Sequence, residues 1–165
     1  MPSCYTGVGS RKTPKDVLYL MENLATMLAN RGWTLRSGGA IGADQAFERG
    51  CAMAQGHRQI FFASDATEQA MLIAEEFHPA WDRMTDYAQH LHGRNALQVL
   101  GADLKTPSKF LVCWTPDSAI SHAERSIQTG GTGTAISIAE SRGIPVFNLS
   151  RHEHRIRIEH FIGIE

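Results

Sequence analysis

The chain has 165 residues, of which 42% are hydrophobic and 20% charged, and its formal net charge is −1. That length suits one domain over residues 1–165, with enough buried surface to fold without disulfides or a metal. The balanced charge argues against long nucleic acid as a partner and favours a small anionic ligand. No apolar run approaches the ~20 residues of a membrane span, so we expect no membrane partner.

Three cysteines stand far apart and form no CxxC pair. Cysteines in this pattern are typical of buried free thiols in a reducing compartment, and we therefore expect a cytoplasmic protein. The eight histidines show no zinc-type pattern with cysteines or acids. We expect neither a metal site nor a bound cofactor.

Runs with strand-like and helix-like patterns alternate along the chain. Short apolar runs predict strands at 4–8, 33–36, 58–63, 109–114 and 144–149. Apolar residues at helical spacing predict helices at 13–32, 43–54, 66–77, 81–100 and 132–142. The tail after Ser150 is ambiguous, since RIRIEHFI alternates as an edge strand would.

This order predicts an α/β fold of the Rossmann-like class. The sheet should be mainly parallel, with five to seven strands and helices on both faces. The run at 109–114 is continuously apolar, which is typical of an interior strand. In such a sheet ligands bind at the carboxyl ends of the strands.

Three glycine-rich loops lead into predicted helices: TGVGSRK at 6–12, SGGAIGAD at 37–44 and GGTGTA at 130–135. The first turn of a helix has unpaired N–H groups and a partial positive charge. Glycine lets the backbone approach an anion without a Cβ in the way, so these loops predict a phosphate site. None is a Walker A sequence, and each alone also fits a tight turn. The residues expected to bind are Gly7, Gly9, Ser10, Arg11, Ser37, Gly38, Gly39, Ala40, Gly42, Ala43, Gly130, Gly131, Thr132, Gly133 and Thr134.

Two acids follow the second loop. Asp44 opens the helix, where it either caps the N-terminus or accepts hydrogen bonds from ribose hydroxyls. Glu48 lies one turn later on the same side and faces either the pocket or water.

At these residues the chain resembles a known family. SGGAIGAD with its small-residue helix resembles the SxGAxGID signature of the DNA-processing protein A Rossmann domain. Arg94-Asn95 is similar to that family's Arg-Asn element, and GGTGTAISIAESRGIPVFNL to its glycine-rich turn, helix and closing strand. In the wider SLOG superfamily, the PGGxGTxxE motif of LOG-type phosphoribohydrolases resembles residues 129–137. The resemblance spans 4–149 and implies a nucleotide site that includes Arg94 and Asn95.

The chain departs from both patterns. Glu48 stands where the DNA-processing family has a histidine, and Ser137 where the LOG enzymes have a glutamate. The proline of the LOG motif is replaced by Thr129. The resemblance therefore implies nucleotide binding and leaves the reaction open.

Two classes of function remain, and both take a small nucleotide as ligand. The first is a hydrolase of an N-glycosidic bond, with Asp44, Glu48 and Arg94 as expected catalytic residues and Asp117 and Glu140 as further carboxylate candidates. The second is a non-catalytic module that senses or sequesters a nucleotide. A DNA-binding mediator is disfavoured by the net charge. Since relatives commonly form dimers, the resemblance implies a homo-oligomer.

Overall fold

A parallel sheet of five strands forms the centre of the protein in the computed structural model, which describes residues 3–163. The strands are β1 (Cys4–Gly7), β2 (Thr34–Ser37), β3 (Arg58–Ile60), β4 (Leu111–Cys113) and β5 (Val146–Asn148). Their order is β3-β2-β1-β4-β5, and every neighbouring pair is parallel. The predicted α/β class is confirmed, with the strand number at the lower end of the expected range.

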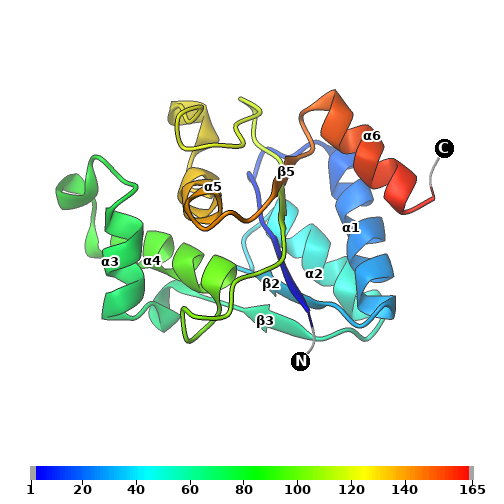
Figure 1. Ribbon diagram of the computed structural model, residues 1–165, viewed down its shortest axis with the longest axis horizontal. Helices are drawn as coiled ribbons and strands as arrows, with labels where there is room; N and C mark the ends of the chain where they lie inside the picture. Colours follow the sequence, from blue (N-terminus) through cyan, green and yellow to red (C-terminus); the bar gives the residue numbers. More distant parts are fainter. Residues whose placement is uncertain (1–2, 164–165) are drawn as a thin grey trace.

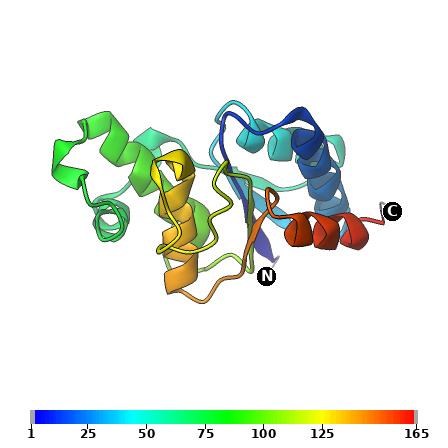
Figure 2. The same cartoon turned by 90° about the horizontal axis from the view of Figure 1, so that it is seen from above.

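Helices cover both faces of the sheet (Figures 1 and 2). They are α1 (Lys15–Asn30), α2 (Ala43–Met53), α3 (Glu68–Glu75), α4 (Asp86–Leu100), α5 (Thr132–Ser141) and α6 (His152–Phe161). Side chains alternate across a strand, so each strand serves two cores. Tyr5, Leu35 and Val112 pack with α1, α2 and α6. Leu111 and Cys113 pack with α4 and α5 on the other face.

The sheet grows in two directions from β1. The chain runs from β1 to β2 to β3, and then crosses back through α3 and α4 to place β4 on the other side of β1. The chain therefore leaves β1 and β4 toward opposite sides of the sheet, which makes the carboxyl ends of these strands the topological switch point of the fold. This edge is where the fold class places a ligand.

The tail after Ser150, which is ambiguous in the sequence, forms helix α6 rather than an edge strand, and its Ile158 is buried against the α1 side of the core. Strand-like alternation was misleading because the helix buries few side chains, so the apolar stripe that marks a helix is weak. At the start of α1, Thr13 Oγ1 donates to the Ser10 carbonyl at 2.6 Å, and Pro14 takes the N-cap position. Among the described helices, none is long and apolar enough to cross a bilayer.

The small residues of α2 allow a close approach, as the sequence predicts, but the closest contact is to a helix. A Cβ on Gly50 would overlap the Glu22 carbonyl oxygen of α1 and lie 2.9 Å from the Cβ of Ala25. The hydroxyl of Thr26 on α1 donates to the Gly50 carbonyl at 2.8 Å. The α1–α2 contact, which supports the β2 loop from behind, therefore requires glycine at this position.

We expect Gly50→Ala to destabilise the protein by about 1–3 kcal/mol, the usual cost of overpacking a tight contact. The loss should outweigh the gain of about 1 kcal/mol that alanine brings to a helix interior. Urea unfolding measures the change. Gly131→Ala is the matched control, because its added Cβ meets no atom within 4 Å. A Gly50→Ala protein as stable as the wild type would show that the two helices are not in this contact.

Candidate functional site

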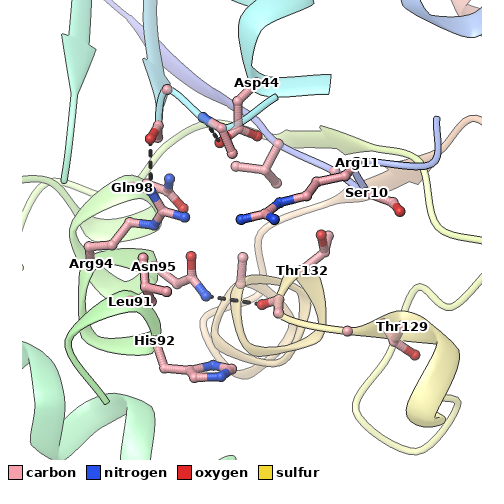
Figure 3. A pocket seen from close by; sticks show the side chains of 18 of the residues that line it. Ser10, Arg11, Asp44, Leu91, His92, Arg94, Asn95, Gln98, Thr129 and Thr132 are labelled. Atoms are coloured by element: carbon pink, nitrogen blue, oxygen red, sulfur yellow. Dashed lines mark hydrogen bonds between the residues drawn. The ribbon is translucent and has the colours of Figure 1, made fainter. Parts of the chain in front are cut away.

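A cleft of about 1010 Å³ lies at the carboxyl ends of the strands. The loop after β1, the loop after β2 and the segment before α5 all line it, together with one face of α4 (Figure 3). The three glycine-rich loops of the sequence thus meet at one site. Of the predicted binding residues, those that line the cleft are Gly9, Ser10, Arg11, Gly38, Gly39, Ala40, Arg94, Asn95, Gly130, Gly131 and Thr132.

Helix α4 contributes a continuous stripe to the cleft wall. Tyr87, Leu91, Arg94, Asn95 and Gln98 all line it. Their spacing of three and four residues places them on one face of the helix. Only Arg94 and Asn95 of these five were predicted from the sequence. The other three lie at helical spacing from Arg94, and this spacing would have predicted them too.

Arg94 joins α4 to the ends of two strands. Its Nη1 donates to the Gly38 carbonyl at 2.8 Å and to the Phe61 carbonyl at 3.3 Å. A Cβ on Gly38 would overlap both Arg94 and Gln98, so only glycine leaves room for this contact. Arg94 Nε is buried and has no partner within residues 3–163. The guanidinium is therefore held by the backbone through Nη1 alone, and its buried Nε makes no hydrogen bond among the described residues.

The β2 loop is occupied by the protein's own carboxylate. The Ala40 amide donates to Asp44 Oδ2 at 3.4 Å, and Asp44 itself is buried. Burial raises the pKa of Asp44 to about 6, against the opposing effects of Arg94 and the loop amides. Asp44 does not cap α2, whose N-cap is Gly42 without a side-chain hydrogen bond. It holds the preceding loop instead, and the contact with ribose hydroxyls stays a prediction.

Other residues of this loop hold the turn in place. Gly42 has a φ of +96°, and a Cβ there would lie 2.9 Å from the Ser10 carbonyl oxygen. Ser37 Oγ donates to the Gly7 carbonyl at 2.6 Å and is fully buried. Ala43 is also buried, and its Cβ packs against Gly9. These residues fix the β1 and β2 loops to each other rather than facing the cleft.

Glu48 lies on the other side of the β2 loop. It lines a separate hollow on α2 with Arg49 and Arg58, and is not among the residues that line the cleft. Burial raises the pKa of Glu48, while Arg58 opposes the shift. The structure thus separates Glu48 from Asp44, although both lie on one side of the helix.

The β1 loop supplies an exposed cation. The Arg11 guanidinium points into the cleft between helix α4 and the N-terminal end of helix α5 (Figure 3). Within residues 3–163 it has no carboxylate partner and no hydrogen bond. Ser10 Oγ accepts from the Lys12 amide at 3.0 Å and so shapes the turn. Gly7 lies in β1, where a Cβ would meet the Phe47 ring at 2.6 Å.

The N-terminal end of helix α5 supplies backbone N–H groups that are free to donate hydrogen bonds. Asn95 Nδ2 donates to the Gly131 carbonyl at 3.0 Å and ties this turn to α4. In the part of the chain that the structure describes, the amides of Gly131 and Thr132 have no hydrogen-bond partner. Gly133 is buried against Arg125 and is not exposed to the cleft.

His92 fixes the first turn of α5. Its Nδ1 lies 2.8 Å from the Thr134 hydroxyl, which is therefore engaged and buried. Burial and the nearby His78, Arg125 and Arg94 lower the pKa of His92 to about 4. At neutral pH His92 is uncharged, so it orients this turn without adding charge to the cleft.

Asp117 organises the wall before α5. It accepts hydrogen bonds from Thr115, Ser126, Thr129 and the Ala119 amide. Partial burial would raise its pKa, but these hydrogen bonds outweigh that effect and lower the pKa to about 2. Glu140, the other distant candidate, accepts from the His122 amide at 2.6 Å. Asp44 is thus the one member of the four carboxylate candidates that lines the cleft.

Within residues 3–163, no group of three or more His, Cys, Asp or Glu side chains is arranged to hold a metal ion.

Residues 3–76 match the family model of DNA recombination-mediator protein A. The resemblance to the DNA-processing protein A Rossmann domain is thereby confirmed for this part of the chain. The matched range includes the β1 and β2 loops and ends before Arg94 and the α5 turn. No curated protein and no solved structure matches the chain significantly. The resemblance to the LOG-type enzymes stays a prediction.

The raised pKa of Asp44 predicts a pH-dependent effect of Asp44→Asn on stability. A carboxyl whose pKa rises from 3.8 to about 6 on folding favours the folded state fully below pH 4. That contribution is lost as the pH rises through 6. Asn and protonated Asp are similar, so the variant should match the wild type at pH 3.5, below both pKa values of the carboxyl. At pH 8 it should be more stable by about 2–3 kcal/mol.

Urea unfolding of both proteins at pH 3.5 and pH 8 tests this prediction. Asp65→Asn is the control, because Asp65 accepts from the Phe62 amide in an exposed turn. A difference between Asp44→Asn and wild type that stays constant with pH would mean that the Asp44 carboxyl is not buried as described.

Proposed function

We propose that the cleft binds a nucleotide or nucleotide derivative, with a phosphate at the α5 end. The observation that carries the proposal is the meeting of free donors from two loops. The Arg11 guanidinium has no ion-pair partner among the described residues, and it points into the same cleft as the unpartnered amides of Gly131 and Thr132 (Figure 3). A cation and a helix N-terminus together favour an anion.

The two other loops have different roles in this proposal. The β2 loop already holds the Asp44 carboxylate, which competes with a phosphate for the same amides. Asp44 and Arg94 lie beside this loop and would face the uncharged part of the ligand. We therefore place the phosphate on the α5 turn alone.

Hydrolysis of the N-glycosidic bond is the reaction that the site could support. Such a reaction needs a carboxylate near the sugar, either to stabilise positive charge or to activate water. Asp44 lines the cleft, and its pKa of about 6 suits proton transfer near neutral pH. Binding without turnover is the alternative, supported by Ser137, which stands where the LOG motif has a glutamate and here bonds to His122 and Arg125.

A DNA-binding role is a third candidate, because the matched family is described as a recombination mediator. Arg11, Lys12 and Arg94 could contact a strand's phosphates at the cleft. The net charge of −1 argues against an extended electrostatic footprint. Competition between a nucleoside monophosphate and a single-stranded oligonucleotide distinguishes mononucleotide binding from DNA binding.

We expect Arg11→Ala to weaken nucleoside monophosphate binding by roughly tenfold to a hundredfold, the usual value of a hydrogen bond to a charged group. The affinity for the corresponding nucleoside, which lacks the phosphate, should not change. Isothermal titration calorimetry measures both. Arg142→Ala is the matched control, since Arg142 is exposed at the opposite end of α5. An equal loss for nucleoside and nucleotide would place the phosphate elsewhere.

If the protein is a hydrolase, incubation with nucleoside monophosphates should release free base, detected by chromatography. Asp44→Asn should abolish release while nucleotide binding and folding are retained. Binding with no release across the four common bases would leave a sensing module. Tighter binding of the oligonucleotide than of any mononucleotide would instead favour the DNA-binding role.

A further inference from the structure

Gln98 is a buried polar side chain without a partner at the wall of the cleft. It is 1% exposed and lines the cleft from α4. Both its Oε1 and its Nε2 lack a hydrogen-bond partner within residues 3–163. A buried amide in this state costs free energy unless a ligand or water completes its hydrogen bonds.

The surrounding protein does not use this amide. The Thr6 hydroxyl bonds to the backbone carbonyl of Gln98 at 2.7 Å, not to its side chain. Nearby, the buried Arg36 is well partnered, with bonds to Gln59 and the Thr106 carbonyl. The Gln98 amide lies directly against Gly38, where a Cβ would overlap its Nε2. Among the buried side-chain atoms of residues 3–163 without a partner, those of Gln98 and Arg94 belong to residues that line the cleft.

Two aromatic side chains with exposed rings belong to the wall of the same cleft. Phe62 and Tyr87 both line it and are 55% and 66% exposed. Phe62 follows the residue whose carbonyl accepts from Arg94, and Tyr87 lies two turns before Arg94 on α4. Aromatic rings exposed at a cleft rim offer stacking surfaces for a planar base.

We infer that Gln98 reads the hydrogen-bonding edge of the nucleobase, with the base ring stacked against Phe62 or Tyr87. The inference rests on the proposed nucleotide binding and adds the group that selects the base. A primary amide presents one donor beside one acceptor. It matches an edge that offers the reverse, such as the exocyclic amine and ring nitrogen of adenine. Arg94 Nε, another buried donor without a partner within residues 3–163, lies on the same face of α4.

The arrangement also divides the ligand between the two ends of the cleft. Arg11 and the first turn of α5 supply a cation and free amides, while on α4 the neutral Gln98 amide lies beside Arg94 (Figure 3). Phe62 and Tyr87 also line the cleft. A nucleotide has the same polarity, with an anion at one end and a neutral planar group at the other. The match in chemistry therefore sets the direction in which the ligand lies.

Three ligands test the inference: ribose 5-phosphate, purine riboside 5′-monophosphate, which adds the purine ring, and AMP, which adds the exocyclic amine. The second differs from AMP only by the missing exocyclic amine. We expect wild-type protein to bind AMP roughly tenfold or more tightly than purine riboside monophosphate. Gln98→Met, which keeps the volume and removes the amide, should erase that difference and leave ribose 5-phosphate binding unchanged.

Two controls accompany the titrations. Gln128→Met changes a glutamine that lines the cleft but is exposed, and should keep the preference for AMP. Tyr87→Ala should weaken AMP roughly tenfold or more if Tyr87 provides the stacking surface, and Phe62→Ala should do so if Phe62 does. Tyr19→Ala, on α1 and equally exposed, should have no effect. Because Gln98→Met removes an unsatisfied amide, its unfolding midpoint should be no lower than that of the wild type.

The outcomes separate the inference from the proposed function. Wild-type protein that binds none of the three ligands contradicts both. Binding of AMP and purine riboside monophosphate with equal affinity leaves nucleotide binding intact and overturns the role of Gln98. A Gln98→Met protein that loses ribose 5-phosphate to the same extent as AMP would also overturn it, since the amide would then act on the sugar or on the fold.

Discussion

The cleft depends on one contact, the docking of the Arg94 guanidinium on the backbone at the ends of β2 and β3. The carbonyls of Gly38 and Phe61 both accept from its Nη1. This contact fixes α4 to the carboxyl edge of the sheet, and α4 in turn holds the α5 turn through Asn95. Three segments distant in sequence thereby form one wall. Glycine at position 38 is required because the side chains of Arg94 and Gln98 fill the space beside it.

The cleft has one positive charge with a carboxylate nearby, Arg94 beside Asp44, and one without, Arg11. Burying Arg94 is costly, and the Asp44 carboxylate nearby offsets part of that cost. The same carboxylate satisfies an amide of the β2 loop. Arg11, by contrast, is exposed and has no carboxylate partner in the described chain. This difference is why the proposed phosphate site lies at the β1–α5 side and not at the β2 loop, although both loops have the same glycine-rich chemistry.

The regular alternation of strand-like and helix-like patterns made the fold predictable from the sequence. The hydrogen bonds between side chains distant in sequence were not predictable in this way. The strand and helix order, the parallel sheet and the meeting of three loops at one edge follow from patterns of apolar residues and glycine. The pattern could not show that Ser37 bonds to Gly7 or that Thr134 bonds to His92, because these partners are distant in sequence. Helix α6 was missed since its buried face is narrow. Gln98 was missed because an isolated glutamine in a helix has no signature of its own.

The residues that line the cleft come partly from the range that matches the family model and partly from outside it. Residues 3–76 contain β1, β2 and their loops, including the Asp44 contact and the Arg11 cation. Helix α4 and the α5 turn lie outside that range and supply Gln98, Arg94, Asn95 and the free amides. The matched part therefore supplies the cations Arg11 and Lys12 to the cleft, while Gln98, the group that we propose selects the base, comes from the remainder. Under this proposal, chains that share the matched part would differ in ligand through the face of α4 that lines the cleft, because the opposite face packs in the core and is not free to vary.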